Sequence, residues 1–104
     1  MIIVTTEEVS GKTIKQHLRI VRGNTIRARH LGRDFMAFLR HIVGGEIRDY
    51  TKMMAEAREQ ALDRMIKEAE ARGANAVVGF RFSPSMIMRG AAEIIAYGTA
   101  VILE

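Results

Sequence analysis

Apolar residues recur at helical spacing through the middle of the chain. From about Arg48 to Arg72 they fall three and four residues apart, at Met54, Ala57, Ala61, Met65 and Ala69. This spacing predicts one long helix with a narrow apolar stripe. Because alanine dominates the stripe, we expect the helix to lie close against a sheet. Asp63–Lys67 and Glu68–Arg72 add acid-before-base pairs four residues apart on this helix.

The segments before this helix alternate between apolar and polar residues, which is typical of strands. We predict strands at residues 2–6, 16–22 and 25–30. Leu18 and Ile20 are expected on one face of the second strand, and Gly23-Asn24 is interpreted as a turn or bulge. In the third strand, the alternation places Arg27 and Arg29 side by side on one face.

A second, shorter helix is predicted between these strands and the long helix. Asp34 lies near its start, where a carboxylate interacts favourably with the helix dipole. Apolar residues recur along it at Phe35, Phe38, Leu39 and Ile42, and Gly44-Gly45 ends it. One long and one short helix on a small antiparallel sheet form a two-layer α+β subunit. Residues 1–104 are expected to make a single domain, since no linker or repeat interrupts them.

The last two predicted strands, at 75–82 and 91–103, suggest that the protein assembles with copies of itself. Strand 91–103 is apolar on both faces, with Ile94, Ala96, Ala100 and Ile102 on one and Ile95, Tyr97, Val101 and Leu103 on the other. An antiparallel sheet with helices on one side needs only one apolar face. We therefore expect another subunit to cover the second face. The apolar segment Met86-Ile87-Met88, placed between the strands, is a further interface candidate.

Charge and composition narrow the function classes. The chain has no cysteine, which excludes disulfides, thiolate metal sites and thiol nucleophiles. Its net charge is +4, and no acidic residue occurs between Glu8 and Asp34. Arg27 and Arg29 in this basic run are candidates for contacting a polyanion; the alternative is a solvated surface paired with acidic groups elsewhere. Only 6% of residues are aromatic, and none interleaves with the basic run, which argues against nucleic acid.

The sequence also bears on location, metal binding and catalysis. No apolar stretch of about 18 residues and no basic leader are present, so we expect a cytoplasmic protein without a membrane partner. His30, His41 and Asp34 are the candidate ligands for a divalent metal ion, the one cofactor we consider; ordinary polar histidines are the alternative. No nucleophile–base set or phosphate loop is present, so we expect a non-enzymatic protein.

Eight short motifs occur in the order and spacing of one family. They are Thr5-Thr6, Val21-x-Gly23, Arg33-Asp34-Phe35, Val43-Gly44-Gly45, Tyr50, Ala57-Arg58, the run from Gly73 to Gly79, and Gly98-Thr99-Ala100-Val101. Over nearly its whole length the chain resembles the YbjQ-like family (UPF0145), which carries the label "putative heavy-metal-binding". One departure stands out: the family usually has Gly-x-Asn just before the Arg-Asp pair, whereas this chain has Ala28-Arg29-His30.

The resemblance implies a dodecin-like α+β subunit and a closed ring, typically of five subunits, with pairing of two rings into ten left open. It implies no established biochemical activity. Among the residues that match its motifs, Arg33, Asp34 and Tyr50 lie around Gly44 and Gly45. An arginine, a carboxylate and a phenol beside two glycines are candidates for an anionic ligand site. The alternative is structural, with Asp34 at a helix start and the glycines ending that helix.

Overall fold

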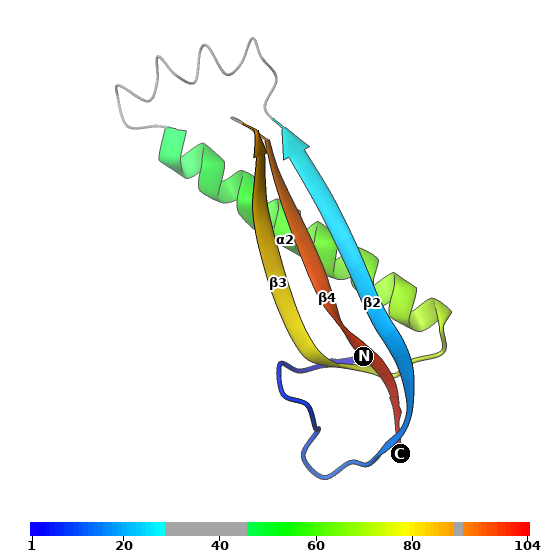
Figure 1. Cartoon of the computed structure of the whole chain (residues 1–104). Helices are drawn as coiled ribbons and strands as arrows, with labels where there is room; N and C mark the ends of the chain where they lie inside the picture. Colours follow the sequence, from blue (N-terminus) through cyan, green and yellow to red (C-terminus); the bar gives the residue numbers. More distant parts are fainter. Residues whose placement is uncertain (29–45, 89–90) are drawn as a thin grey trace.

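The computed structural model describes residues 1–28, 46–88 and 91–104 (Figure 1). Its elements are strand β1 (Ile2–Ile3), strand β2 (Ile14–Ala28), helix α2 (Glu46–Ala71), strand β3 (Ala76–Met88) and strand β4 (Ala91–Leu103). The strand order is β1-β3-β4-β2. Strand β4 runs antiparallel to both β2 and β3, whereas β1 is parallel to β3. Helix α2 lies along one face of the sheet, so the described residues form a two-layer α+β fold (Figure 1).

The apolar stripe predicted for the long helix is confirmed. Ala57, Ala61, Met65 and Ala69 are fully or almost fully buried against the sheet. The helix ends where Gly73 adopts a left-handed backbone with φ of 83°, and the amide of Ala74 donates to the carbonyl of Ala69 at 3.0 Å. This glycine C-cap stops the helix and returns the chain directly into β3.

The interpretation of Gly23-Asn24 as a turn is wrong, because β2 runs unbroken through both residues. Gly23 pairs with Ala96 of β4 and lies beneath α2. A Cβ atom at this position would collide with the backbone of Ala61 and Met65. The glycine is therefore a point of close approach between helix and strand, and the predicted strand 16–22 and the described part of 25–30 belong to one strand.

Leu18 and Ile20 do not share a face as predicted. The β2–β4 register shifts between His17 and Ile20, and Arg19 within this irregularity has a φ of 73°. The extra residue reverses the alternation. Leu18 therefore packs against the core under α2, while Ile20 is 66% exposed on the opposite face.

The left-handed conformation of Arg19 leads to a stability prediction. An L-residue other than glycine costs about 1–2 kcal/mol in this region. Arg19→Gly should therefore raise the free energy of unfolding by about 0.5–1 kcal/mol, since glycine also loses more chain entropy on folding. Chemical denaturation at fixed protein concentration measures the change. Arg22→Gly, in regular strand, should instead destabilise the protein; equal losses for both variants would contradict the prediction.

Two strand boundaries also differ from expectation. Strand β1 covers only Ile2–Ile3, although Val4 and Thr6 continue to exchange backbone hydrogen bonds with β3. Strand β3 continues to Met88, so the apolar segment 86–88 belongs to the strand and is not a loop. The predicted short helix and residues 29–45 lie outside the described residues.

The second face of β4 is covered in part by the chain itself. Val101 is 0% exposed and Leu103 is buried, because Val4 and Val9 of the N-terminal segment and Ile14 at the start of β2 pack against them. The expectation that another subunit must cover this whole face is therefore wrong for that end of the strand. Farther along the same face, Tyr97 is 39% exposed and Ile26 on the adjacent β2 is 58% exposed. We call the sheet surface away from α2 the outer face.

Candidate functional site

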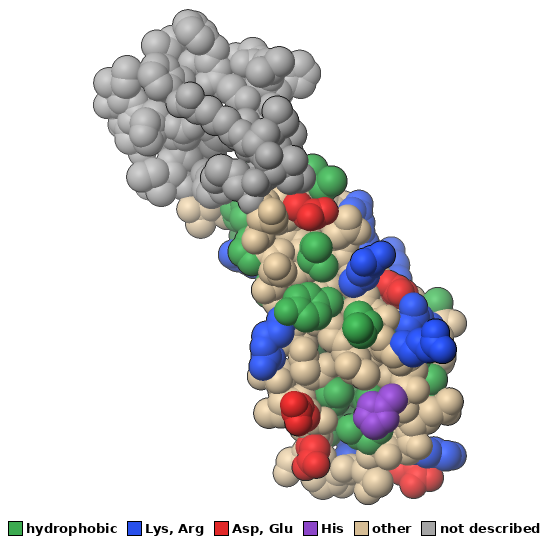
Figure 2. All heavy atoms as spheres, in the orientation of Figure 1, with side chains coloured by type: hydrophobic (Ala, Val, Ile, Leu, Met, Phe, Trp, Pro, Cys, Tyr) green, Lys and Arg blue, Asp and Glu red, His purple; other side chains and the backbone are tan. Residues whose placement is uncertain are grey.

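A hollow of about 510 Å³ lies on the outer face, near the end covered by the N-terminal segment. Its lining combines carboxylates, an imidazole and a hydroxyl with apolar side chains, namely Glu7, Glu8, Ile14, His17, Val78, Gly79 and Thr99. Figure 2 shows the histidine near the lower end of this face, with acidic side chains across from it and apolar ones between. The volume is within the range of small-molecule sites. Its polar groups suit a ligand that donates hydrogen bonds or carries positive charge.

Three chain segments build this hollow. The N-terminal segment brings Glu7 and Glu8, and Gly79 of β3 takes a φ of 64° where the β3–β4 register shifts. His17 comes from β2, just before the irregularity at Arg19. Glu7, Glu8 and His17 could not be predicted from sequence as a site, because none of them belongs to a recognisable motif. Their proximity depends on the N-terminal segment folding back across the sheet.

The described side chains do not gather the ligands of a metal centre. Within 1–28, 46–88 and 91–104, no group of three or more His, Asp or Glu residues is placed to hold a metal ion. Zinc and similar ions need three or four such ligands around one point. The predicted ligands His30, Asp34 and His41 lie outside the described residues. The described residues therefore do not fit a metal centre.

An exposed row of apolar and basic residues crosses the outer face above the hollow. The sheet register sets Tyr97 of β4 between Arg22 of β2 and Arg81 of β3, and all three are exposed. Ile20 and Ile26 flank this row on β2. Apolar side chains gather at the centre of this face, with Lys or Arg groups at both sides (Figure 2). An apolar centre with a charged rim is the usual composition of a protein–protein contact surface.

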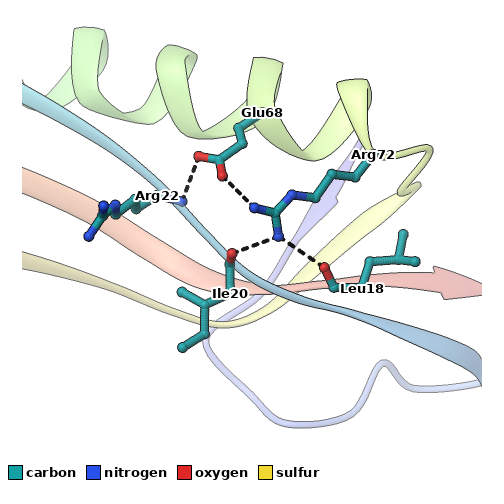
Figure 3. Close-up of polar contacts among 5 residues, drawn as sticks. All are labelled: Leu18, Ile20, Arg22, Glu68 and Arg72. Carbon is teal, nitrogen blue, oxygen red and sulfur yellow. Dashed lines mark hydrogen bonds and ion pairs between the residues drawn. The ribbon is translucent and has the colours of Figure 1, made fainter.

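The free edge of β2 is closed by side chains of α2 (Figure 3). The Nη1 group of Arg72 donates to the carbonyls of Leu18 at 3.0 Å and Ile20 at 2.9 Å. Glu68 accepts from the amide of Arg22 at 3.2 Å and pairs with Arg72 at 2.8 Å. We call these contacts the edge clamp. One turn earlier on the helix, Arg64 donates to the carbonyl of Asn24 at 2.7 Å. Backbone groups that would otherwise accept another strand are thereby occupied.

Arg27, predicted as a polyanion contact, lies on the face of β2 that packs beneath α2. It is partly buried, and its Nη2 group donates to Oε1 of Gln60 at 3.0 Å. Its predicted neighbour Arg29 lies outside the described residues, as do Arg33, Asp34, Gly44 and Gly45. Tyr50 lies in the first turns of α2. The structure therefore places Arg27 and Tyr50 on known elements and leaves the predicted anionic site untested.

Sequence comparison supplies the family. The model of the YbjQ family, described as "putative heavy-metal-binding", matches residues 1–104. The chain belongs to the UPF0145 family. A UPF0145 protein of Thermotoga maritima is 59% identical over 104 residues, covering all of this chain and 98% of the relative. Another, from Clostridioides difficile, is 56% identical over 104 residues, covering all of this chain and 93% of that protein.

A solved structure supports the fold of this UPF0145 chain. A Pediococcus pentosaceus protein of unknown function, assigned to the DUF74 family, superposes with a TM-score of 0.59 at 16% identity. The match covers 100% of this chain and 98% of the other. At this identity the likeness extends to the fold alone. Among the described residues, no helix has the length and hydropathy needed to cross a membrane.

Proposed function

We propose that this UPF0145 chain is the subunit of a closed homo-oligomeric ring, with five members, that holds a small ligand or ion at its subunit junctions. The observation that carries the proposal is the exposed apolar surface of the outer face. Ile20, Ile26 and Tyr97 project there without cover from the described chain. Burying such surface against a neighbour gains about 25 cal/mol per Å². A head-to-tail contact of this kind closes into a ring when its rotation permits.

The shape of the subunit supports assembly. Its Cα radius of gyration is 17.3 Å, with extents of 55 × 22 × 16 Å. A self-contained domain of this length has a radius of gyration of about 13 Å. The three long strands contain 13 to 15 residues each, whereas about 5–6 is usual. Among the described residues, the long strands expose more surface than α2 covers, and contact with copies of the chain would remove that surface from water.

Faces, rather than strand edges, are the surfaces that would meet in this ring. The edge clamp occupies β2 from Leu18 to Arg22, and residues 2–6 occupy the start of the β3 edge. Beyond them, Pro84 lies within β3 and has no amide hydrogen to donate to another strand. The outer face also has complementary charge along its length, with Arg22 and Arg81 at its middle and acidic residues by the hollow. In a ring the outer face meets a different surface of the neighbour, so these charged groups would face that surface.

The ligand part of the proposal rests on where the hollow lies. It opens on the same outer face that a neighbour would cover, so assembly would enclose it at a junction. Glu7, Glu8 and His17 would then face a bound molecule away from bulk water. The family description favours a metal ion as a second candidate, although the described residues do not form a metal centre. Native mass spectrometry of protein purified without chelator separates these cases, since a retained metal or organic ligand adds its own mass.

Substituting the outer face tests the ring. Native mass spectrometry should give five or ten subunits for the wild type, and Ile26→Lys combined with Tyr97→Lys should leave a folded 11.7 kDa monomer. Both side chains are substantially exposed within the subunit, so a lysine there should not disturb its core. Val101→Lys is unsuitable, because Val101 belongs to the subunit's own core.

Ala71→Lys, at the exposed end of α2, serves as the control and should retain the wild-type mass. A monomeric wild type would overturn the ring. A ring of unchanged mass in the double variant would show that the outer face is not the contact. Circular dichroism of each variant verifies that the monomer is folded.

A further inference from the structure

Two polar groups beneath α2 lack hydrogen-bond partners. Thr25 of β2 is 2% exposed, and its hydroxyl Oγ1 is buried without a partner. Two residues along the strand, Nε of Arg27 is also buried and unpartnered. Residues at i and i+2 of a strand project from the same face, so both groups lie on the side that packs against the helix. Buried donors in proteins are almost always paired, and each unpaired one costs about 1–3 kcal/mol.

The partner that Arg27 does have is electrically neutral. Its Nη2 group donates to the amide oxygen of Gln60 at 3.0 Å, which leaves the guanidinium charge without an acidic counterpart in that contact. A partly buried charge is stabilised far better by an anion than by an amide. The Nε–H and a terminal N–H of a guanidinium form a fork that matches two oxygens of one oxyanion.

We propose that Thr25 and Arg27 form a binding site for a small oxyanion. One oxygen of a phosphate or carboxylate accepts from Nε of Arg27, and the hydroxyl of Thr25 donates to the same anion. Gln60 accepts from Nη2, the terminal nitrogen beside Nε, so the anion takes the Nε–H while Gln60 steadies the guanidinium. Arg27 as a whole is only partly buried, whereas its Nε and the hydroxyl of Thr25 are closed to solvent, so an anion enters when the Arg27 side chain shifts outward. The site lies within one subunit and does not depend on the proposed ring.

Inorganic phosphate is the first probe. Thermal unfolding is measured in phosphate and in chloride at equal ionic strength, pH and protein concentration, with acetate in parallel to represent carboxylates. Above the Kd, each tenfold increase in phosphate should raise Tm by about 5 °C or more. Phosphorus NMR of the wild type should show broadening of the phosphate signal on adding protein. A response to acetate alone would identify a carboxylate site. Equal Tm values in all three salts, with no broadening, would overturn the proposal.

Three variants test whether the phosphate-dependent rise in Tm depends on Thr25 and Arg27. Arg27→Gln should abolish the phosphate-dependent shift. Thr25→Val, which keeps the side-chain shape, should raise Tm in chloride by removing an unpaired hydroxyl, yet reduce the shift in phosphate by at least half. Arg22→Gln removes the same charge from the outer face of the same strand and should respond as the wild type.

The same variants define the results that would contradict the proposed oxyanion site. A full response in Arg27→Gln would overturn the site, as would an equal loss in Arg22→Gln, which indicates general screening of positive charge. A lower Tm in chloride for Thr25→Val, with a full phosphate response, would assign the hydroxyl a purely structural role. Should Arg27→Gln fail to fold, Thr25→Val and the NMR measurement decide the question.

Discussion

Replacing Gly23 with alanine should lower the free energy of unfolding by about 3 kcal/mol, the upper end of the usual cost of overpacking. The new Cβ would collide with the backbone of Ala61 and Met65 and with the Cβ of Arg64. Backbone atoms of a helix cannot rotate away as a side chain does, so α2 must move off the sheet. That shift would loosen the whole alanine-rich contact, because Ala57, Ala61 and Ala69 have no length with which to refill a gap.

The measurement is chemical denaturation followed by circular dichroism at one protein concentration. Gly11→Ala is the matched control, since nothing lies within 4 Å of its Cβ position and only its φ of 75° is unfavourable. Its loss should be about 1–2 kcal/mol. If Gly23→Ala and Gly11→Ala lower the free energy of unfolding equally, close packing of α2 on Gly23 does not contribute to stability. A further test is Ala61→Gly, which should not restore Gly23→Ala, because the obstruction is backbone.

Replacing Arg72 with alanine should cost about 2 kcal/mol and promote aggregation. The change removes the hydrogen bonds to the carbonyls of Leu18 and Ile20, and hydrogen bonds that involve a charged group contribute about 1.5–3 kcal/mol. Arg72 is partly exposed, so we take the lower part of that range for the pair. Its ion pair with Glu68 adds little, because both groups are partly exposed. Without the edge clamp, the β2 edge presents free backbone groups to other chains.

Denaturation and light scattering on heating test this expectation. Arg58→Ala, at an exposed position of the same helix, is the control and should change stability by less than about 0.5 kcal/mol. Arg72→Lys should recover only part of the loss, since an ammonium group does not reproduce the planar fork. If Arg72→Ala keeps the stability and light scattering of the wild type, the edge clamp contributes neither to stability nor to protection from aggregation. Loss of stability without aggregation would show that the β2 edge is protected by other means.

The helix stripe was predictable from sequence because it depends on local periodicity. Burial of Ala57, Ala61, Met65 and Ala69 follows from their spacing alone. The edge clamp was predictable only in part. The Glu68–Arg72 pair is visible as an i,i+4 spacing, whereas its contacts with β2 join residues about fifty positions apart. No local pattern encodes such a distance.

The predictions for Gly23-Asn24 and for Leu18 and Ile20 were wrong because contacts within the sheet override the local sequence pattern. Gly23 and Asn24 have the composition of a turn, and a local rule treats them so. The strand continues because β4 pairs with both residues and α2 needs the space that a glycine leaves. Similarly, the period of two in Leu18 and Ile20 is broken by one bulge residue, Arg19, which shows no bulge signature in sequence.

The long helix, its buried stripe, the two apolar faces of the last strand and the family followed from the sequence alone. These features depend on spacing along the chain or on motifs in a fixed order. Only the tertiary structure decided that the N-terminal segment covers one end of β4 and creates the hollow with Glu7, Glu8 and His17. It also decided that Arg27 lies beneath α2 beside an unpaired Thr25. These outcomes depend on which segments far apart in the sequence come into contact. The packing free energy of the whole sheet determines those contacts.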